Sequence, residues 1–217
     1  MKTYKLPTLD TVAQTVVLAN GEFPKNCLPL TILKNSKYIV CCDGAVNQLM
    51  DSQVERVPDA IVGDCDSLRP ENRKWFESII FTVSEQDTND LTKSISFCEA
   101  SGRKKIVILG ATGRREDHTI GNISLLAEYL DLPGMDVEII TDYGIYRAID
   151  STSEFESRVG QQVSIFSIGQ DAVTTHNLRY PITRGTLTNW WQGTLNEVLG
   201  DSFVIEVEGK TIVFRAF

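Results

Sequence analysis

Acidic side chains occur in this sequence at a spacing that suits a metal-dependent reaction on phosphate groups. Asp64 and Asp66 are separated by a single residue in the run Gly63-Asp64-Cys65-Asp66-Ser67. Two carboxylates this close repel each other unless a cation or a proton lies between them, so we interpret the pair as a metal site. Oxygen ligands favour Mg²⁺, which takes one or two carboxylates and receives further ligands from water and substrate phosphates.

Three more segments with polar side chains follow β-rich runs. They are Asp43-Gly44-Ala45, Gln86-Asp87-Thr88-Asn89-Asp90, and the stretch from Gly110 to His118. Ligands of open parallel sheets bind beyond the carboxyl ends of the strands, where such segments meet. Asp is also a common N-cap and turn residue, so each segment alone has a structural alternative. Four acidic strand ends together predict one functional edge.

The segment Gly110-Ala111-Thr112-Gly113-Arg114-Arg115 is suited to phosphate. Its glycines and Thr112 allow backbone N–H groups to approach an anion near the start of a helix, and the two arginines supply positive charge. No Gly-Lys-Ser/Thr follows, so this is not a Walker A loop. Ala19-Asn20-Gly21-Glu22 also lacks the dinucleotide fingerprint. Ordinary P-loop ATPases and NAD-dependent dehydrogenases are therefore disfavoured.

Two kinds of periodicity position these segments. Up to about residue 142, short β-rich runs alternate with segments of helical period, which predicts an α/β domain with a mainly parallel sheet flanked by helices. The expected strands are 15–19, 38–42, 60–62, 79–82, 105–109 and 136–140, and the expected helices are 45–51, 70–76, 90–100 and 118–130.

The remainder of the chain has only short alternating runs. Residues 163–168, 203–207 and 211–214 predict a smaller antiparallel β-sandwich or barrel, with Glu208-Gly209-Lys210 as a tight hairpin turn. We therefore expect a catalytic α/β domain over residues 1–142 and a β-sandwich domain over residues 143–217.

Composition excludes several classes of protein. The 217 residues carry a formal net charge of −8, which disfavours a nucleic-acid-binding surface. The five cysteines are odd in number and lack CxxC spacing, so zinc and disulfide frameworks are disfavoured. No run of 18 apolar residues indicates a membrane span, and the polar N-terminal stretch has no signal-peptide pattern. We expect a cytoplasmic protein.

Taken together, the motifs resemble the thiamine pyrophosphokinase family over most of the chain and in the same order. The resemblance rests on Asp43-Gly44-Ala45, on Pro58 to Ser67, on Gln86-Asp87 through Asp90-Leu91-Thr92-Lys93, and on Gly110 to Gly113 with Arg115-x-Asp117-His118. It implies transfer of a diphosphoryl group from ATP to the hydroxyethyl oxygen of thiamine, with AMP released. It also implies Mg²⁺ and a homodimer with active sites at the subunit interface.

The resemblance assigns roles to individual positions. Asp64, Asp66 and Asp117 correspond to the acidic positions around Mg²⁺, with Asp90 and Arg115 as further catalytic positions. The nucleotide-binding positions are Asp43, Gly110, Thr112, Gly113 and Arg114, and the thiamine-binding positions are Gln86, Trp190, Trp191, Leu195 and Asn196. The general base stays open among Asp64, Asp66 and Asp90, because a base is identified by geometry before pKa.

Three positions depart from the family pattern. Asn89 stands where Thr is usual, Arg114 where bacterial members have Gly, and Leu195 where the family has Ser in a Gly-x-Ser-Asn turn. Two alternatives to the family function remain: another Mg²⁺-dependent phosphotransferase or phosphohydrolase, and a catalytically dead sensor of thiamine diphosphate or a nucleotide.

Overall fold

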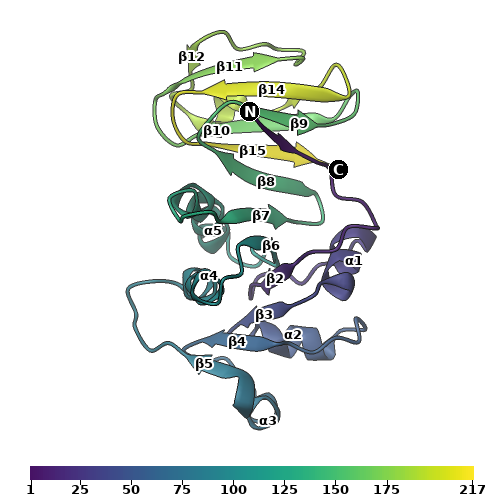
Figure 1. The fold of residues 1–217 in the computed structure, drawn as a ribbon, viewed down its shortest axis with the longest axis vertical. Coiled ribbons are helices and arrows are strands. Elements are labelled where there is room, and N and C mark those ends of the chain that lie inside the picture. The colour runs from purple at the N-terminus through teal and green to yellow at the C-terminus, as the bar shows by residue number, and fades with distance from the viewer. The chain divides into compact units, whose positions relative to one another are not determined.

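The protein is described by a computed structural model that covers residues 1–217. The chain divides into two compact units (Figure 1). The first, called here the parallel-sheet unit, comprises residues 9–125 and 134–142. The second, called here the β unit, comprises residues 1–8, 126–133 and 143–217.

Six parallel strands form the sheet of the parallel-sheet unit, in the order β7-β6-β2-β3-β4-β5. They are β2 (Thr15–Leu18), β3 (Ile39–Cys42), β4 (Ala60–Gly63), β5 (Ile80–Thr82), β6 (Lys105–Leu109) and β7 (Asp136–Ile140). Every residue of β2, β3 and β4 is buried, as expected for strands covered on both faces. The strand order reverses between β2 and β6, which is where ligands bind in sheets of this kind.

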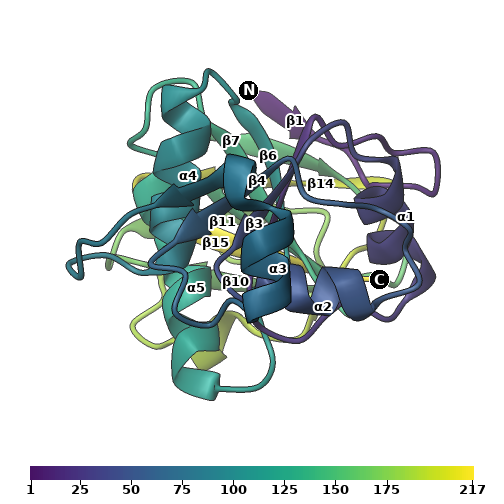
Figure 2. The same cartoon turned by 90° about the horizontal axis from the view of Figure 1, so that it is seen from below.

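Helices cover both faces of this sheet. They are α1 (Cys27–Asn35), α2 (Ala45–Asp51), α3 (Pro70–Trp75), α4 (Asp90–Ala100) and α5 (Glu116–Tyr129), with a short 3₁₀ helix η1 (Glu77–Ile79). In Figures 1 and 2, α1 and α2 lie on one face, and α4 and the first part of α5 lie on the other.

The six strands and four helices expected in this part of the chain are all present. The sequence analysis missed α1, which carries Pro29 in its first turn and buries only one short stripe, so its helical period is weak.

The β unit contains two groups of hydrogen-bonded strands. One has the order β1-β9-β14-β11-β12, and the other has the order β13-β10-β15-β8. The strands are β1 (Lys2–Tyr4), β8 (Gly144–Ile149), β9 (Ser153–Glu156), β10 (Gln162–Ser167), β11 (Ala172–His176), β12 (Gly185–Thr186), β13 (Asn196–Glu197), β14 (Ser202–Val207) and β15 (Thr211–Ala216), with the 3₁₀ helix η2 (Trp190–Gly193). Side chains from both groups, including Phe155, Ile165, Phe203 and Val213, form one apolar core.

The N-terminal strand β1 belongs to the β unit, which the sequence pattern does not indicate. It pairs in parallel with β9, whereas the other pairs in this unit are antiparallel. The guanidinium of Arg215, only 1% exposed, donates hydrogen bonds to the backbone oxygens of Tyr4, Lys5 and Glu156. These bonds fasten the start of the chain to its last strand.

The predicted hairpin at Glu208-Gly209-Lys210 is wrong. β14 pairs with β9 and β11, while β15 pairs with β8 and β10, so the turn carries the chain from one group of strands to the other. Both β14 and β15 contribute residues to the shared core. The two strands face each other across this core, as strands of two packed sheets do, and do not pair side by side. The broader prediction, a mixed α/β fold, is confirmed. None of the helices combines the length and the apolar content needed to cross a bilayer.

Candidate active site

A pocket of about 500 Å³ opens at the carboxyl ends of the parallel strands. Its walls come from the loops that follow β2, β3, β4, β5 and β6, so it lies at the edge where the sequence analysis expected the functional side chains. Seven of the residues predicted for the site line this pocket: Asp43, Asp64, Gln86, Asp90, Gly113, Arg114 and Arg115.

Three carboxylates gather at one side of the pocket. Asp43 directly follows β3, Asp64 directly follows β4, and Asp90 begins α4. A Cβ placed on Gly63 would lie 2.9 Å from the Cβ of Asp43 and 3.2 Å from Oδ1 of Asp90. Gly63, with φ of +154°, therefore allows these two acidic residues to approach each other.

The electrostatics of this group favour a bound cation. Burial, and then the charge of Asp43, raise the pKa of the Asp90 carboxyl above its ordinary value, and Asp64 raises it further. Asp43 is 4% exposed, and its Oδ1 is buried without a hydrogen-bond partner, while Oδ2 accepts a hydrogen bond from the Ser67 backbone at 3.3 Å. An unpaired buried carboxylate oxygen beside two other carboxylates is costly in the absence of positive charge.

Lys93 supplies one fixed positive charge. Its ammonium lies 3.6 Å from Oδ1 of Asp90, one turn earlier on α4, and its side chain is only 3% exposed. This charge lowers the pKa of Asp90 against the larger effects of burial and Asp43. Lys93 also lines the pocket, so its buried ammonium helps to hold the half-buried Asp90 carboxylate in place.

Asp66 lies apart from these carboxylates. Cys65 is buried and has φ of +65°, and the backbone N–H of Asp66 donates to Oδ1 of Asp64 at 3.1 Å. The side chain of Asp66 is exposed and does not line the pocket. The structure therefore brings Asp64 to the pocket and leaves the joint role of the Asp64-x-Asp66 pair as a prediction.

The glycine-rich loop after β6 is fixed to the loop after β2. Gly110 and Gly113 have φ of +67° and +76°, and the carbonyls of Gly110 and Thr112 each accept a backbone hydrogen bond of 2.8 Å, from Gly21 and Glu22 respectively. A Cβ on Gly21 would collide with both carbonyl oxygens. Gly113 lines the pocket, whereas Gly110 and Thr112 hold the two loops together.

Arg115 and Asp117 form a bidentate ion pair at the start of α5. Nε donates to Oδ1 at 3.1 Å and Nη2 to Oδ2 at 2.5 Å. These bonds lower the pKa of Asp117 to about 2. Arg115 lines the pocket together with His118, while Asp117 is exposed beside it. Asp117 is therefore engaged with Arg115 rather than with the three clustered carboxylates.

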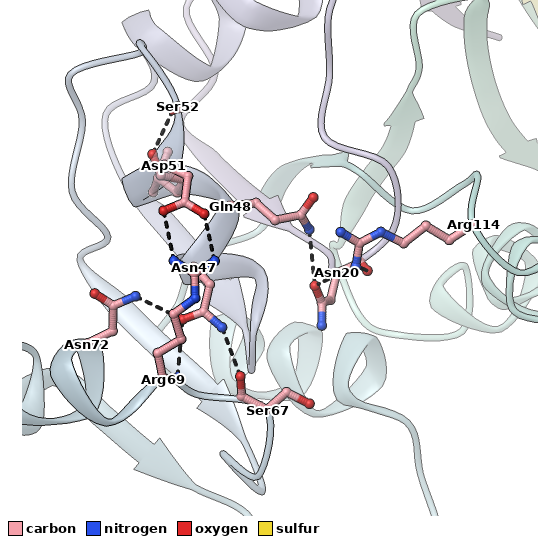
Figure 3. Close-up of polar contacts among 10 residues, drawn as sticks. Asn20, Asn47, Gln48, Asp51, Ser52, Ser67, Arg69, Asn72 and Arg114 are labelled. Atoms are coloured by element: carbon pink, nitrogen blue, oxygen red, sulfur yellow. Dashed lines mark hydrogen bonds and ion pairs between the residues drawn. The ribbon is translucent and has the colours of Figure 1, made fainter.

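Two side chains of helix α2 donate hydrogen bonds to two of the pocket loops (Figure 3). Asn47 donates to the carbonyl of Ser67 at 2.8 Å, which fixes the loop that carries Asp64. Gln48 donates to Oδ1 of Asn20 at 3.1 Å and to the carbonyl of Gly21 at 3.2 Å. The sequence analysis missed Asn20 and both α2 residues. Asn20 had a usable signal, because it directly follows the strand predicted over residues 15–19.

The predicted thiamine residues of the β unit have different environments. Trp190 donates its indole N–H to the carbonyl of Ser167 at 3.1 Å and packs edge-on against Phe166. Asn196 is buried and holds the Tyr180 backbone through bonds of 2.7 and 3.1 Å. These contacts give both residues a structural role.

The two remaining thiamine candidates of the β unit are open to solvent. Trp191 and Leu195 are each 70% exposed. Leu195 also has φ of +59°, a backbone conformation that a branched side chain rarely adopts. Gln86 lies in the other unit and lines the pocket.

The side chains alone form no ready-made metal centre. No group of three or more His, Cys, Asp or Glu side chains is arranged to hold an ion. Mg²⁺ does not require one, because it usually binds to one or two carboxylates and completes its shell with water and substrate phosphates. The unpartnered oxygen of Asp43 and the crowded carboxylates of Asp64 and Asp90 fit that mode of binding.

Family models match nearly the whole chain. Residues 30–149 match the model described as thiamin pyrophosphokinase, catalytic domain, and residues 144–214 match the model described as thiamin pyrophosphokinase, substrate-binding domain.

Individual relatives agree with these models. Thiamine pyrophosphokinase 1 of Oryza sativa subsp. japonica is 32% identical over 143 residues, which is 55% of this chain and 53% of the relative. The match thus spans about half the length of that relative. Thiamine pyrophosphokinase 2 of the same organism is 25% identical over an alignment of 246 positions, covering 97% of this chain and 88% of the relative.

Solved structures show the same fold. Thiamin pyrophosphokinase from Candida albicans superposes with a TM-score of 0.81 at 20% identity, covering 100% of this chain and 92% of the other. Thiamine pyrophosphokinase from Bacillus subtilis gives a TM-score of 0.75 at 22% identity, covering 93% and 98%.

Proposed function

The chain belongs to the thiamin pyrophosphokinase family, and from this premise we propose that it transfers a diphosphoryl group from ATP to the hydroxyethyl oxygen of thiamine. The products are thiamine diphosphate and AMP. The observation that carries the proposal is the pocket at the strand ends, whose lining combines Asp43, Asp64 and Asp90 with the basic side chains of the glycine-rich loop.

This division of charge suits a polyphosphate. An acidic protein repels ATP unless positive charge is supplied locally. We propose that Asp64 and Asp90, with the free oxygen of Asp43, hold Mg²⁺, and that Asp66 and Asp117 contribute once the nucleotide is bound. When bound, the ion reduces the charge repulsion between phosphate oxygens and the incoming alcohol.

The chain's own residues supply the remaining functions. Arg115 lines the pocket and carries the charge that matches a phosphate, while its pairing with Asp117 orients the guanidinium before the nucleotide arrives. The backbone around Gly113 offers N–H groups to the same region. Lys93 holds Asp90, so that the carboxylate presents one defined orientation.

Among the three candidates for the base, Asp90 is best placed. It begins α4 at the pocket wall, beside the position proposed for the ion. We propose that the Asp90 oxygen left free by the ion accepts the proton of the thiamine hydroxyl. The hydroxyl oxygen attacks the β-phosphorus of ATP, the bond from that phosphorus to the α–β bridging oxygen breaks, and AMP leaves.

The thiamine contacts rest on the family resemblance. We propose that Gln86 and the exposed Trp191 contact thiamine, and that the protein forms a homodimer with active sites at the subunit interface. The exposed indole offers a face for a cationic ring. All five cysteines are free thiols, which supports a reducing location such as the cytoplasm.

The decisive experiment is a product assay with ATP, Mg²⁺ and thiamine. Chromatography must resolve AMP from ADP and thiamine diphosphate from the monophosphate. Equal amounts of thiamine diphosphate and AMP are the expected result. Formation of ADP, or hydrolysis of ATP without phosphorylated thiamine, would indicate another phosphotransferase or a phosphohydrolase. Tight nucleotide binding without turnover would indicate a sensor.

A further inference from the structure

Asn20 lines the pocket, and no role assigned so far uses its side chain. It stands two residues after β2, next to Gly21. Its Oδ1 accepts hydrogen bonds from Nε2 of Gln48 at 3.1 Å and from Nη1 of Arg114 at 3.4 Å, and its backbone oxygen accepts from the same Nη1 at 3.2 Å. Figure 3 shows both donors on one side of the Asn20 amide.

These two donors fix which way round the amide lies. A guanidinium has only donors, so the Asn20 atom that faces Arg114 must be oxygen. The side-chain atom of Gln48 that faces Asn20 also contacts the carbonyl of Gly21, which can only accept, so that atom is the amide nitrogen. The NH₂ group of Asn20 is therefore forced to the opposite side.

On that side, the NH₂ group lies near Gly44, between the pocket-lining residues Asp43 and Ser67. In Figure 3, Nδ2 of Asn20 points away from Gln48 and Arg114. It would lie 3.0 Å from a Cβ placed on Gly44, which borders the loop of Ser67 at the pocket wall. A fixed neutral donor next to the carboxylate cluster can bind an oxygen of the nucleotide without adding charge.

Building on the proposed function, we infer that Asn20 is a further nucleotide-binding residue, and that Arg114 is a positioning residue that holds the Asn20 amide with its NH₂ group toward the nucleotide. This differs from the sequence-based expectation that Arg114 itself contacts phosphate. Arg114 has φ of +62° and directs its guanidinium to the carbonyl and side-chain oxygens of Asn20. The recognised group is an acceptor oxygen of the nucleotide.

A double-mutant cycle separates the two roles of Arg114. Dissociation constants of a non-hydrolysable ATP analogue with Mg²⁺ are measured by calorimetry for the wild type, Asn20→Ala, Arg114→Ala and the double variant. We expect each single variant to bind about fivefold more weakly, which corresponds to one hydrogen bond. The double variant should bind no more weakly than Asn20→Ala alone. Losses that multiply would show that Arg114 contacts the nucleotide directly and would overturn the inference.

Two further readouts exclude a purely structural role. The loss from Asn20→Ala should be the same at 50 and 200 mM salt, since a neutral donor is not screened, whereas the loss of a direct contact between a charge and phosphate would shrink with added salt. Asn20→Asp keeps the shape and gives Arg114 a carboxylate partner, so the melting temperature should hold while nucleotide affinity falls. Retained affinity in Asn20→Asp would contradict a donor role. Arg158→Ala, on the exposed surface of the β unit, controls for the loss of one positive charge.

The wild-type titration distinguishes this inference from the proposed function. Failure of the wild type to bind the analogue would overturn the proposed function and the inference together. Wild-type binding with multiplicative, salt-dependent losses would overturn the inference and leave the proposed function standing.

Discussion

The two units of the chain position their candidate residues in different ways. In the parallel-sheet unit, loops from five strands deliver side chains to one pocket, and residues as distant in sequence as Asp43 and Arg115 share its wall. In the β unit, four candidates that lie within seven residues of sequence range from buried Asn196 to the exposed Trp191 and Leu195.

The difference follows from strand geometry. Parallel strands all end at the same edge, so any side chain just after a strand is brought to one place. Antiparallel strands alternate in direction and their turns lie at both ends, so proximity in sequence says little about a shared site. A motif at the end of a parallel strand is therefore stronger evidence for a functional site than a motif of equal length in an antiparallel unit.

The largest effect on catalysis is expected at the acidic edge, the cluster of Asp43, Asp64 and Asp90. Asp64→Asn should reduce kcat by at least about 100-fold, because the site loses one of the negative carboxylates that we propose to hold the metal ion. The melting temperature should hold or rise, since the change removes one of the charges that repel Asp90. Steady-state kinetics and calorimetry measure the two quantities, and full activity in this variant would refute the role of Asp64.

Replacing the two tryptophans of η2 should affect different properties: thiamine binding for Trp191 and stability for Trp190. Trp191→Ala should raise KM for thiamine about tenfold, through loss of one stacking partner, and leave KM for ATP and the melting temperature unchanged. Trp190→Ala should lower stability by about 2 kcal/mol, because it removes the packing on Phe166 and the bond to Ser167. Equal effects on thiamine binding would show that the exposed and packed rings do not differ in role.

From the ion pair of Lys93 and Asp90 we expect the metal affinity to depend on pH. Lys93 lowers the pKa of Asp90, so Lys93→Met should raise that pKa further above its ordinary value. Because Mg²⁺ binds the deprotonated carboxylate, the variant should lose more metal affinity at pH 6 than at pH 8. Titrations at both pH values test this, with the exposed Lys74→Met as the control. An equal loss at both would show that Lys93 does not act through Asp90.

The smallest effect is expected at Leu195, where the family has Ser. Leu195→Ser should lower KM for thiamine about threefold, the gain from one hydrogen bond. The exposed position makes a change in stability of more than about 0.5 kcal/mol unexpected. No change in KM would remove position 195 from the thiamine site.

Much of the pocket at the strand ends was predictable from sequence. The β-rich runs and the polar residues that follow them identify both the strands and the pocket, because buried parallel strands have an unmistakable composition. What the pattern could not predict were contacts made across the fold. Gln48 reaches Asn20 from a helix 28 residues away, and Arg114 reaches it from 94 residues away.

The β unit was harder for a related reason. β14 and β15 follow each other in sequence and alternate in the same way, yet they belong to different groups of strands. Alternation identifies a buried face but not the strand next to it. The attachment of β1 to this unit depends on Arg215, whose hydrogen bonds to Tyr4 and Lys5 cross more than 200 residues of sequence.

We propose above all that Asp64 and Asp90 in the parallel-sheet unit bind the metal of a metal–nucleotide complex. Electron paramagnetic resonance with Mn²⁺ in place of Mg²⁺ tests it directly, because the signal of free Mn²⁺ falls as the ion binds. We expect the wild-type protein to bind one Mn²⁺ ion per chain in the presence of a non-hydrolysable ATP analogue. The double variant Asp64→Asn with Asp90→Asn should lose this binding. Unchanged Mn²⁺ binding by the double variant would show that Asp64 and Asp90 do not hold the metal.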